Sequence, residues 1–237
     1  LKNIYENELT RKIWEAKETY YKNSNLTIVT QSHWLANLAK QSSLFKSFPI
    51  HVIPNPIDTC IFKHIDKKEA KQKLGLDVSK KYLLFAAMNT RHKRKGFDYL
   101  KESLSLYKNK NPLTANIELL IVGKYDEAIK SEFNFKTHQL GIITDENKMV
   151  TVYNAAEAFL IPSLEDNLPN TVMEAMACGT PVVGFKTGGI PEMVDHLKNG
   201  YIAEYGSTED LTKGISWILS YDNLSSLSLN AREKVIN

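Results

Sequence analysis

The sequence predicts an α/β protein whose main body is a doubly wound domain around a parallel sheet. Short apolar runs such as 117–122 and 158–161 have the composition of buried strands. Stretches with helical periodicity, such as 96–108 and 145–154, alternate with these runs. Because strands that alternate with helices build βαβ units, we expect a parallel sheet covered by helices on both faces.

The first part of the chain, residues 1–62, is expected to be the end of a preceding Rossmann-like domain together with the linker that follows it. Apolar and aromatic residues spaced among many charges predict an amphipathic helix over 1–23. Strands are predicted over 26–30 and 51–53. Ser32 is the predicted N-cap of the helix between these strands.

The boundary between the two parts is predicted at residues 62/63, just after a proline-rich turn. Pro54 and Pro56 exclude a helix there and set an extended conformation. Residues 63–237 then form the second domain. Its strands are expected over 82–88, 117–122, 138–140, 158–161 and 181–184. Its helices are expected over 96–108, 145–154, 170–178, 191–195, 208–220 and 227–235.

The composition argues against several other classes of protein. The chain has 237 residues, of which 43% are hydrophobic and 24% charged, and a formal net charge of +3. It has no basic run dense enough to follow a nucleic-acid backbone, so no nucleic-acid partner is expected. No apolar run reaches the roughly 18 residues of a membrane span, and no signal peptide is visible. Two distant cysteines favour reduced thiols and a cytoplasmic protein.

The two ends of the sequence predict that the chain is part of a longer protein. It starts at Leu1 and enters a charged segment at once, and it stops inside a helical pattern. We therefore expect the larger part of the first domain to be missing.

The most informative stretch is 161–183, in which a strand, an acidic loop and a helix follow one another. The predicted helix begins near Asn170 and ends at Gly179. Its start lies at the carboxyl edge of the sheet, where free N–H groups and the positive end of the helix dipole favour a phosphate. Asp166 precedes the helix and Glu174 lies one turn inside it, so both are interpreted as readers of sugar hydroxyls. The alternative is that these acids only stabilise the helix dipole.

This stretch resembles the signature of the large retaining glycosyltransferase family four. The usual signature is an acid, seven residues and a Glu, followed by Ala-Met-Ala-Cys-Gly-Thr-Pro-Val-Val, and here Asp166 and Glu174 enclose the seven residues. The first acid is Asp where the family usually has Glu, and neighbouring Glu165 remains an alternative for its role. The Asn-Leu-Pro-Asn-Thr form resembles members that build bacterial surface polysaccharides. The resemblance continues in Gly188-Gly189-Ile190-Pro191-Glu192, Asn199-Gly200 and Lys95-Gly96.

The resemblance implies a GT-B fold, in which residues 63–237 are the C-terminal domain that binds the nucleotide-sugar donor. It implies that Glu174 binds the ribose hydroxyls and that Asp166 binds a hydroxyl of the donor sugar. It also implies retention of the anomeric configuration, through front-face attack assisted by the leaving phosphate. Further implied contacts are the backbone N–H groups of Asn170, Thr171 and Val172 with the diphosphate, and the backbone of Gly141 and Ile142 with the base.

A second candidate site is the basic loop 89–98, which crowds cationic side chains between a predicted strand and a predicted helix. Taken alone, such a run is usually a solvated loop. Beside a helix that accepts a phosphate, its cations would stabilise the departing nucleoside diphosphate. The resemblance assigns this role to Lys95, and both Arg94 and Arg91 remain candidates for the accompanying arginine. The residues expected to act in catalysis are therefore Lys95, Arg94, Asp166 and Glu174.

No cofactor is expected besides the donor substrate, a UDP- or GDP-sugar. The histidines have no metal-ligand spacing and the sequence has no Asp-x-Asp motif, so no required metal is expected. The absence of Gly-x-Gly-x-x-Gly argues against an NAD site.

The resemblance also implies the partners of the whole protein. The acceptor would be a saccharide or a lipid-linked saccharide, in polysaccharide or glycoconjugate biosynthesis. The location would be cytoplasmic, with peripheral attachment of the full-length protein to the inner face of the membrane as an option. The isolated chain is expected to bind donor but to transfer poorly. Two alternatives stay open: a binding module with little or no catalysis, and a nucleotide-sugar epimerase on the same fold.

Overall fold

The computed structural model describes residues 8–90, 92–112, 114–124, 126–221 and 223–237. The chain divides into two compact units, Leu1–Asn55 and Pro56–Asn237. This division falls before the predicted boundary at 62/63. The reason is that Ile57, Ile61 and Phe62 already pack against the hydrophobic core of the second unit.

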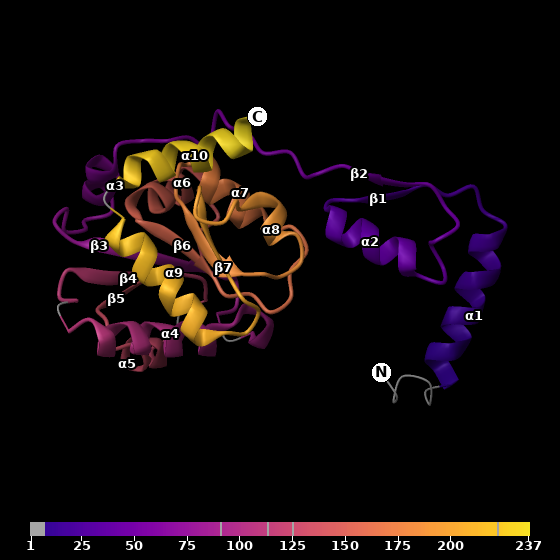
Figure 1. Ribbon diagram of the computed structural model, residues 1–237, viewed down its shortest axis with the longest axis horizontal. Helices are drawn as coiled ribbons and strands as arrows, with labels where there is room; N and C mark the ends of the chain where they lie inside the picture. The colour runs from indigo at the N-terminus through magenta and orange to yellow at the C-terminus, as the bar shows by residue number, and fades with distance from the viewer. Residues whose placement is uncertain (1–7, 91, 113, 125, 222) are drawn as a thin grey trace. The chain divides into compact units, whose positions relative to one another are not determined.

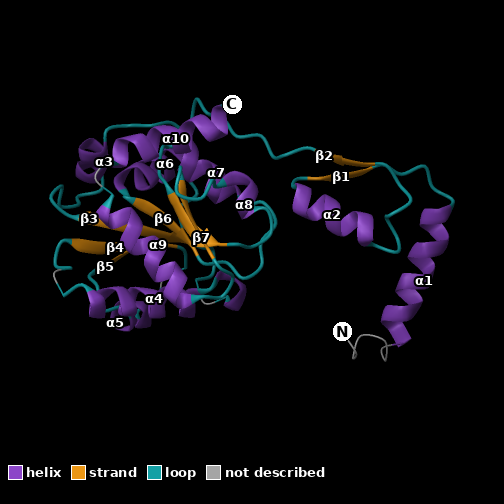
Figure 2. Cartoon of the chain, in the orientation of Figure 1, coloured by secondary structure: helices purple, strands orange, loops and turns teal. Residues whose placement is uncertain are grey.

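The first unit contains a small βαβ arrangement (Figure 2). Helix α1 (Glu8–Lys22) comes first, and strands β1 (Ile28–Thr30) and β2 (Ile50–Val52) then pair in parallel on either side of helix α2 (His33–Gln41) in the sequence. The hydroxyl of Ser32 accepts a hydrogen bond of 3.1 Å from the N–H of Leu35 at the start of α2. The predicted strands and the predicted N-cap of this unit are therefore confirmed.

The second unit is built on a six-stranded sheet in the order β5-β4-β3-β6-β7-β8, and neighbouring strands pair in parallel. The chain enters at the centre with β3, winds outward to β5, and returns to β6 beside β3. The winding direction reverses between β3 and β6, which makes this pair the topological switch point. The strands are β3 (Lys81–Ala86), β4 (Ile117–Val122), β5 (Thr137–Gly141), β6 (Ala158–Ile161), β7 (Val182–Phe185) and β8 (Gly200–Ala203).

Helices cover both faces of this sheet, as Figure 1 shows. One face carries α3 (Lys67–Lys73), α6 (Glu146–Ala155), α7 (Asn170–Ala177), the single turn α8 (Ile190–Met193) and α10 (Leu224–Ile236). The other face carries α4 (Phe97–Lys110), α5 (Ala128–Glu132) and α9 (Thr208–Ser220).

Alternate residues of the strands pack into two separate hydrophobic cores, one on each face of the sheet. Tyr82 and Leu84 of β3 join the core under α6 and α7, whereas Leu83 and Phe85 join the core under α4 and α9. Strand residues that alternate between two buried faces are the physical basis of the continuous apolar runs in the sequence. The prediction of a doubly wound parallel sheet is confirmed.

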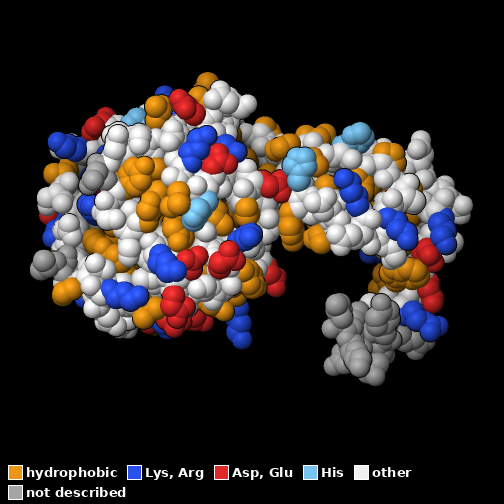
Figure 3. Space-filling view, viewed as in Figure 1, with side chains coloured by type: hydrophobic (Ala, Val, Ile, Leu, Met, Phe, Trp, Pro, Cys, Tyr) orange, Lys and Arg blue, Asp and Glu red, His pale blue; other side chains and the backbone are white. Residues whose placement is uncertain are grey.

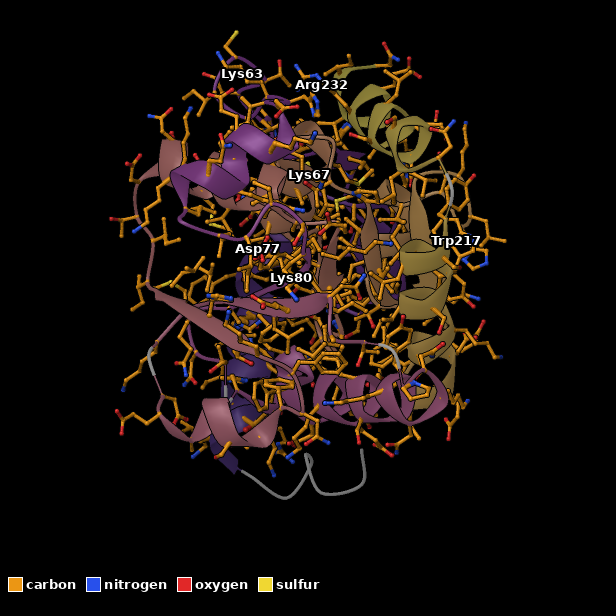
Figure 4. All side chains as sticks on the ribbon, turned by 90° about the vertical axis from the view of Figure 1, so that its left-hand side faces the viewer. Lys63, Lys67, Asp77, Lys80, Trp217 and Arg232 are labelled. Atoms are coloured by element: carbon orange, nitrogen blue, oxygen red, sulfur yellow. The ribbon has the colours of Figure 1, made fainter. Side chains whose placement is uncertain are left out.

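Cations neutralise the helix ends at the amino edge of the sheet (Figure 4). Lys81 donates to the carbonyl of Leu219 in the last turn of α9 at 2.8 Å. Lys67 and Arg232 donate to carbonyls at the ends of α6 and α7, those of Ala156 and Ala177. Helix C-termini carry partial negative charge and unpaired carbonyl groups, so positive side chains stabilise them there.

A buried ion pair joins α3 to the sheet at the same edge. The ammonium of Lys71 lies 2.9 Å from Oε1 of Glu157, and both side chains are 5% exposed. Lys71 also donates to the carbonyl of Lys80 at 2.7 Å, and Glu157 accepts the N–H of Tyr82, the second residue of β3. The pair therefore satisfies two backbone groups at the start of β3 and ties this strand to α3 and to the residue before β6.

Removing one partner of this ion pair should destabilise the second unit strongly. Lys71→Met leaves Glu157 buried without its counter-charge, which typically costs about 3–5 kcal/mol. Lys73→Met is the matched control, because Lys73 pairs with Glu69 at 2.7 Å on the solvent side, where both side chains are 55% exposed. Urea unfolding should show a change of less than about 1 kcal/mol for the control. Equal losses in the two variants would contradict the role of the buried pair.

Candidate functional site

The candidate site lies at the carboxyl edge of the sheet, at the switch point between β3 and β6. Doubly wound sheets bind ligands in the crevice that such a reversal opens. Three loops meet here: 87–96 after β3, 162–169 after β6, and 186–189 after β7.

The first two loops touch through their backbones. The carbonyl of Arg94 accepts the N–H of Leu164 at 2.8 Å and that of Glu165 at 3.4 Å. Gly96 follows a turn of 3-10 helix (Lys93–Lys95) and has a φ of 69°, a conformation that favours glycine. A Cβ at Gly96 would lie 1.8 Å from the carbonyl oxygen of Pro162. Only glycine allows the loops to approach this closely.

The third loop holds the other side of Asp166. A Cβ at Gly188, whose φ is 55°, would lie 1.8 Å from the carbonyl oxygen of Asp166. The N–H of Gly189 donates to the carbonyl of Asn167 at 2.6 Å. The backbone of Asp166 is therefore fixed between the loops that follow β3 and β7.

This arrangement brings together two of the predicted site residues, Lys95 and Asp166. Nζ of Lys95 lies 2.7 Å from Oδ2 of Asp166, and the side chains are 23% and 14% exposed. Neighbouring Glu165 is exposed. Of the two acids that the sequence left as alternatives, Asp166 is the one that pairs with the cation at the switch point.

Helix α7 begins beside this ion pair. Its N-cap is Pro169, whose side chain makes no capping hydrogen bond. The N–H of Val172 donates to the carbonyl of Pro169 at 3.0 Å, so a phosphate contact at Val172 would have to share this group. Asn170 is exposed, Thr171 is half-buried and Val172 is fully buried. The positive end of the helix dipole faces the carboxyl edge.

Glu174 lies one turn further along α7 and is oriented by a tyrosine. The hydroxyl of Tyr153 in α6 donates to Oε2 of Glu174 at 2.8 Å. Burial raises the pKa of Glu174, and the nearby charge of Glu146 adds to the effect, while the Tyr153 hydrogen bond lowers it. Burial, with the charge of Glu174, also raises the pKa of Tyr153 well above its usual range. Nothing in the sequence around Tyr153 signals this hydroxyl contact.

The remaining predicted residues lie further along the edge or outside the described residues. The carbonyl of Gly141, at the end of β5, accepts the N–H of Gly123 at 2.9 Å. Ile142 follows and is 51% exposed. The side chain of Arg94 is exposed. Arg91 lies outside the described residues. Which of Arg91 and Arg94 accompanies Lys95 at the diphosphate therefore stays open.

A cavity of about 540 Å³ lies at the opposite, amino edge of the sheet. Its lining includes Lys67 and Arg232, which already donate to the helix-end carbonyls described above. Arg232 also donates to the carbonyl of Phe62 at 3.2 Å. Because these cations neutralise helix C-termini, the cavity is a poorer place for a phosphate than the switch point.

Neither a metal cluster nor a membrane span is found within the described residues. They contain no group of three or more His, Cys, Asp and Glu side chains that could hold a metal ion. In the same part of the chain, every helix is too short or too polar to cross a bilayer. Lys and Arg side chains are interspersed with acidic ones on the face of the second unit that Figure 3 shows.

A doubly wound domain with a cation, an acid and a helix start at its switch point defines a class of α/β proteins that bind ligands at that crevice. The comparisons give the family. The pattern of the family described as "Glycosyl transferases group 1" matches residues 66–234. The chain belongs to this family, so the resemblance noted in the sequence is confirmed.

Curated relatives include two bacterial transferases. The chain is 28% identical to D-inositol 3-phosphate glycosyltransferase of Segniliparus rotundus over 181 residues, which are 72% of the chain and 39% of the relative. It is 24% identical to UDP-Gal:alpha-D-GlcNAc-diphosphoundecaprenol alpha-1,3-galactosyltransferase of Escherichia coli over 194 residues, 79% of the chain and 50% of the relative. The chain thus spans half or less of the length of these relatives.

Solved structures show the same fold. Sucrose-phosphate synthase from Thermosynechococcus elongatus superposes with a TM-score of 0.78 at 23% identity, over 99% of this chain and 58% of that one. HepE from Anabaena, solved in complex with UDP-glucose, superposes with a TM-score of 0.73 at 19% identity, over 95% and 62%. Since these neighbours are GT-B glycosyltransferases, the predicted GT-B, Rossmann-like fold is confirmed.

The close approach at Gly96 can be tested against a second glycine. Gly75 has a φ of 67°, nearly that of Gly96, but no atom lies within 4 Å of its virtual Cβ. In both alanine variants the left-handed backbone conformation destabilises the folded chain by roughly 1–2 kcal/mol. Gly96→Ala should lose roughly 1–3 kcal/mol more in urea unfolding, because its Cβ meets the Pro162 carbonyl. Equal losses would show that this contact does not hold the loops together.

The raised pKa of Glu174 predicts a pH-dependent difference in stability. Its folded-state pKa lies above the ordinary value of 4.5, so the protonated carboxyl favours the folded chain. This contribution is complete below pH 4.5 and is lost as the pH rises through the folded-state pKa. Glu174→Gln cannot ionise and keeps an acceptor for Tyr153. The unfolding free energy of Glu174→Gln minus that of wild type should therefore increase from pH 4 to pH 8, as measured by urea unfolding. A constant difference would refute the assignment.

Proposed function

We propose that this chain is the donor-binding part of a retaining glycosyltransferase, and that it binds a nucleotide-diphosphate sugar at the switch point. The observation that carries the proposal is the Lys95–Asp166 pair, 2.7 Å apart, beside the start of α7. A cation and a helix N-terminus converge there, as a diphosphate requires. Asp166, which can accept hydrogen bonds from sugar hydroxyls, lies beside the same cation.

Each predicted residue has a role in this proposal. Lys95, with Arg94 or Arg91, neutralises the diphosphate, and the backbone at Asn170, Thr171 and Val172 faces it. Glu174, held by Tyr153, binds the ribose, and Asp166 binds the sugar. The backbone at Gly141 and Ile142 lines the base pocket.

The transfer itself would use few groups of this chain. Preorganised cations stabilise the charge that develops on the leaving diphosphate, which is the largest contribution a site of this kind offers. The acceptor would attack the same face of the sugar that the diphosphate leaves, giving retention. Groups that bind the acceptor would belong to the rest of the protein, so the isolated chain would transfer poorly.

The acceptor is proposed to be a saccharide or a lipid-linked saccharide in polysaccharide or glycoconjugate biosynthesis. Support comes from the Escherichia coli relative, whose name gives UDP-Gal as donor and a diphosphoundecaprenol-linked sugar as acceptor. Such an acceptor would place the whole protein in the cytoplasm, peripherally attached to the inner face of the membrane.

A thermal-shift screen with UDP-, GDP-, ADP- and CMP-sugars tests the proposal. A bound donor stabilises the chain by about 2.7 kcal/mol at a hundredfold excess over Kd. We expect one nucleotide series to stabilise the chain and EDTA to leave the effect unchanged. No stabilisation by any series would contradict donor binding, and its loss on chelation would contradict a metal-free site.

Glu174→Gln should weaken the bare nucleoside diphosphate and the nucleotide sugar alike. The variant removes the charge from an acceptor that contacts the ribose, a part common to both ligands. Hydrogen bonds to charged groups are worth about 1.5–3 kcal/mol, so both affinities should fall roughly 10- to 100-fold in calorimetry. A loss of affinity for the nucleotide sugar alone would show that Glu174 contacts the donor sugar and not the ribose.

A further inference from the structure

An acid is built into the crevice where the proposed function places a diphosphate. Asp166 lies 2.7 Å from the ammonium of Lys95, and its side chain is only 14% exposed. An ammonium has three N–H donors, so Lys95 can donate to Asp166 and still donate to phosphate oxygens. The carboxylate of Asp166 would then lie close to the diphosphate without being displaced from the cation.

The backbone that carries this carboxylate is held on both sides. Leu164 and Glu165 donate to the Arg94 carbonyl just before Asp166 in the sequence. Gly188 packs against the carbonyl of Asp166 on the other side. Three loops therefore set the position of the Asp166 backbone, and the ion pair with Lys95 orients its carboxylate.

The two ligands of a transfer reaction differ in charge at this position. In the donor, the terminal phosphate is esterified by the sugar. After transfer the terminal phosphate is free. Like a phosphate monoester, whose second pKa is about 6, it then carries an additional negative charge at pH 7. A fixed carboxylate repels that additional charge, whereas it accepts hydrogen bonds from the hydroxyls of a sugar.

We propose that Asp166 is a specificity-determining residue that makes the site favour the sugar-bearing diphosphate over the bare nucleoside diphosphate. Its charge weakens binding of the product and so assists product release. The inference rests on the proposed function, because it takes the diphosphate to lie beside Lys95.

Calorimetry with three matched ligands separates charge from sugar recognition. The probes are UDP, the β-methyl ester of UDP and UDP-glucose, with the guanosine and adenosine counterparts run in parallel. The methyl ester has the charge of the nucleotide sugar but none of the sugar hydroxyls. Asp166→Asn should bind UDP about 3- to 10-fold more tightly, since it removes a unit charge several ångströms from the terminal phosphate. It should leave the methyl ester within about twofold and bind UDP-glucose about 10-fold more weakly.

Two variants serve as controls. Asp166→Glu keeps the charge, so the ratio of UDP to methyl-ester affinity should stay at the wild-type value. Glu165→Gln removes the neighbouring, exposed carboxylate and should leave all three affinities unchanged. Circular dichroism and thermal unfolding of each variant verify that the fold is retained.

Three results would overturn the inference. Asp166→Asn could change the affinities for UDP and for its methyl ester equally, which would show that Asp166 only positions Lys95. Glu165→Gln could raise the affinity for UDP as much as Asp166→Asn does, which would show a general effect of surface charge. Asp166→Glu could behave like Asp166→Asn, which would remove the role of charge. If wild type binds no ligand of any base series, the proposed function itself fails.

Discussion

The candidate site depends on one close approach of two backbones across the switch point of the sheet. The loop after β3 passes so near the loop after β6 that a Cβ at Gly96 would lie 1.8 Å from the carbonyl oxygen of Pro162. Lys95 and Asp166 are carried by these two loops, and the approach brings them to 2.7 Å. A wider separation of the loops would leave a solvated lysine and a solvated aspartate in place of a partly buried ion pair.

The parallel sheet also sorts charge between its two edges. Strands run one way and the connecting helices run back, so helix C-termini gather at the amino edge and helix N-termini at the carboxyl edge. Lys81 and Arg232 neutralise the ends of α9 and α7 at the amino edge. At the carboxyl edge α7 begins after Pro169, whose side chain makes no capping hydrogen bond. The amino edge therefore holds cations that stabilise the fold itself, whereas the anionic ligand that we propose would lie at the carboxyl edge.

Most of the fold could be predicted because its strands are short, apolar and buried on both faces. The strands at the centre of the sheet fall where the apolar runs predict them. Helix α3, the short helix α5 (Ala128–Glu132) and strand β8 were not predicted. The sequence of α3, Lys67–Lys73, is strongly polar and buries Lys71 through its pairing with Glu157, which no pattern in the sequence reveals. Strand β8 (Gly200–Ala203) is a short edge strand with only two fully buried residues, so its apolar signal is weak.

The sequence by itself determined the fold class, the family and the residues that gather at the carboxyl edge, because periodicity and a long motif are local properties of the chain. Only the tertiary structure decided which of these residues meet. It selected Asp166 over Glu165 as the partner of Lys95 and gave Glu174 a hydroxyl donor in Tyr153. It also showed the Val172 amide already bonded within its helix. These choices depend on distances between segments that are remote in sequence, and such distances are set by the packing of the sheet and its loops.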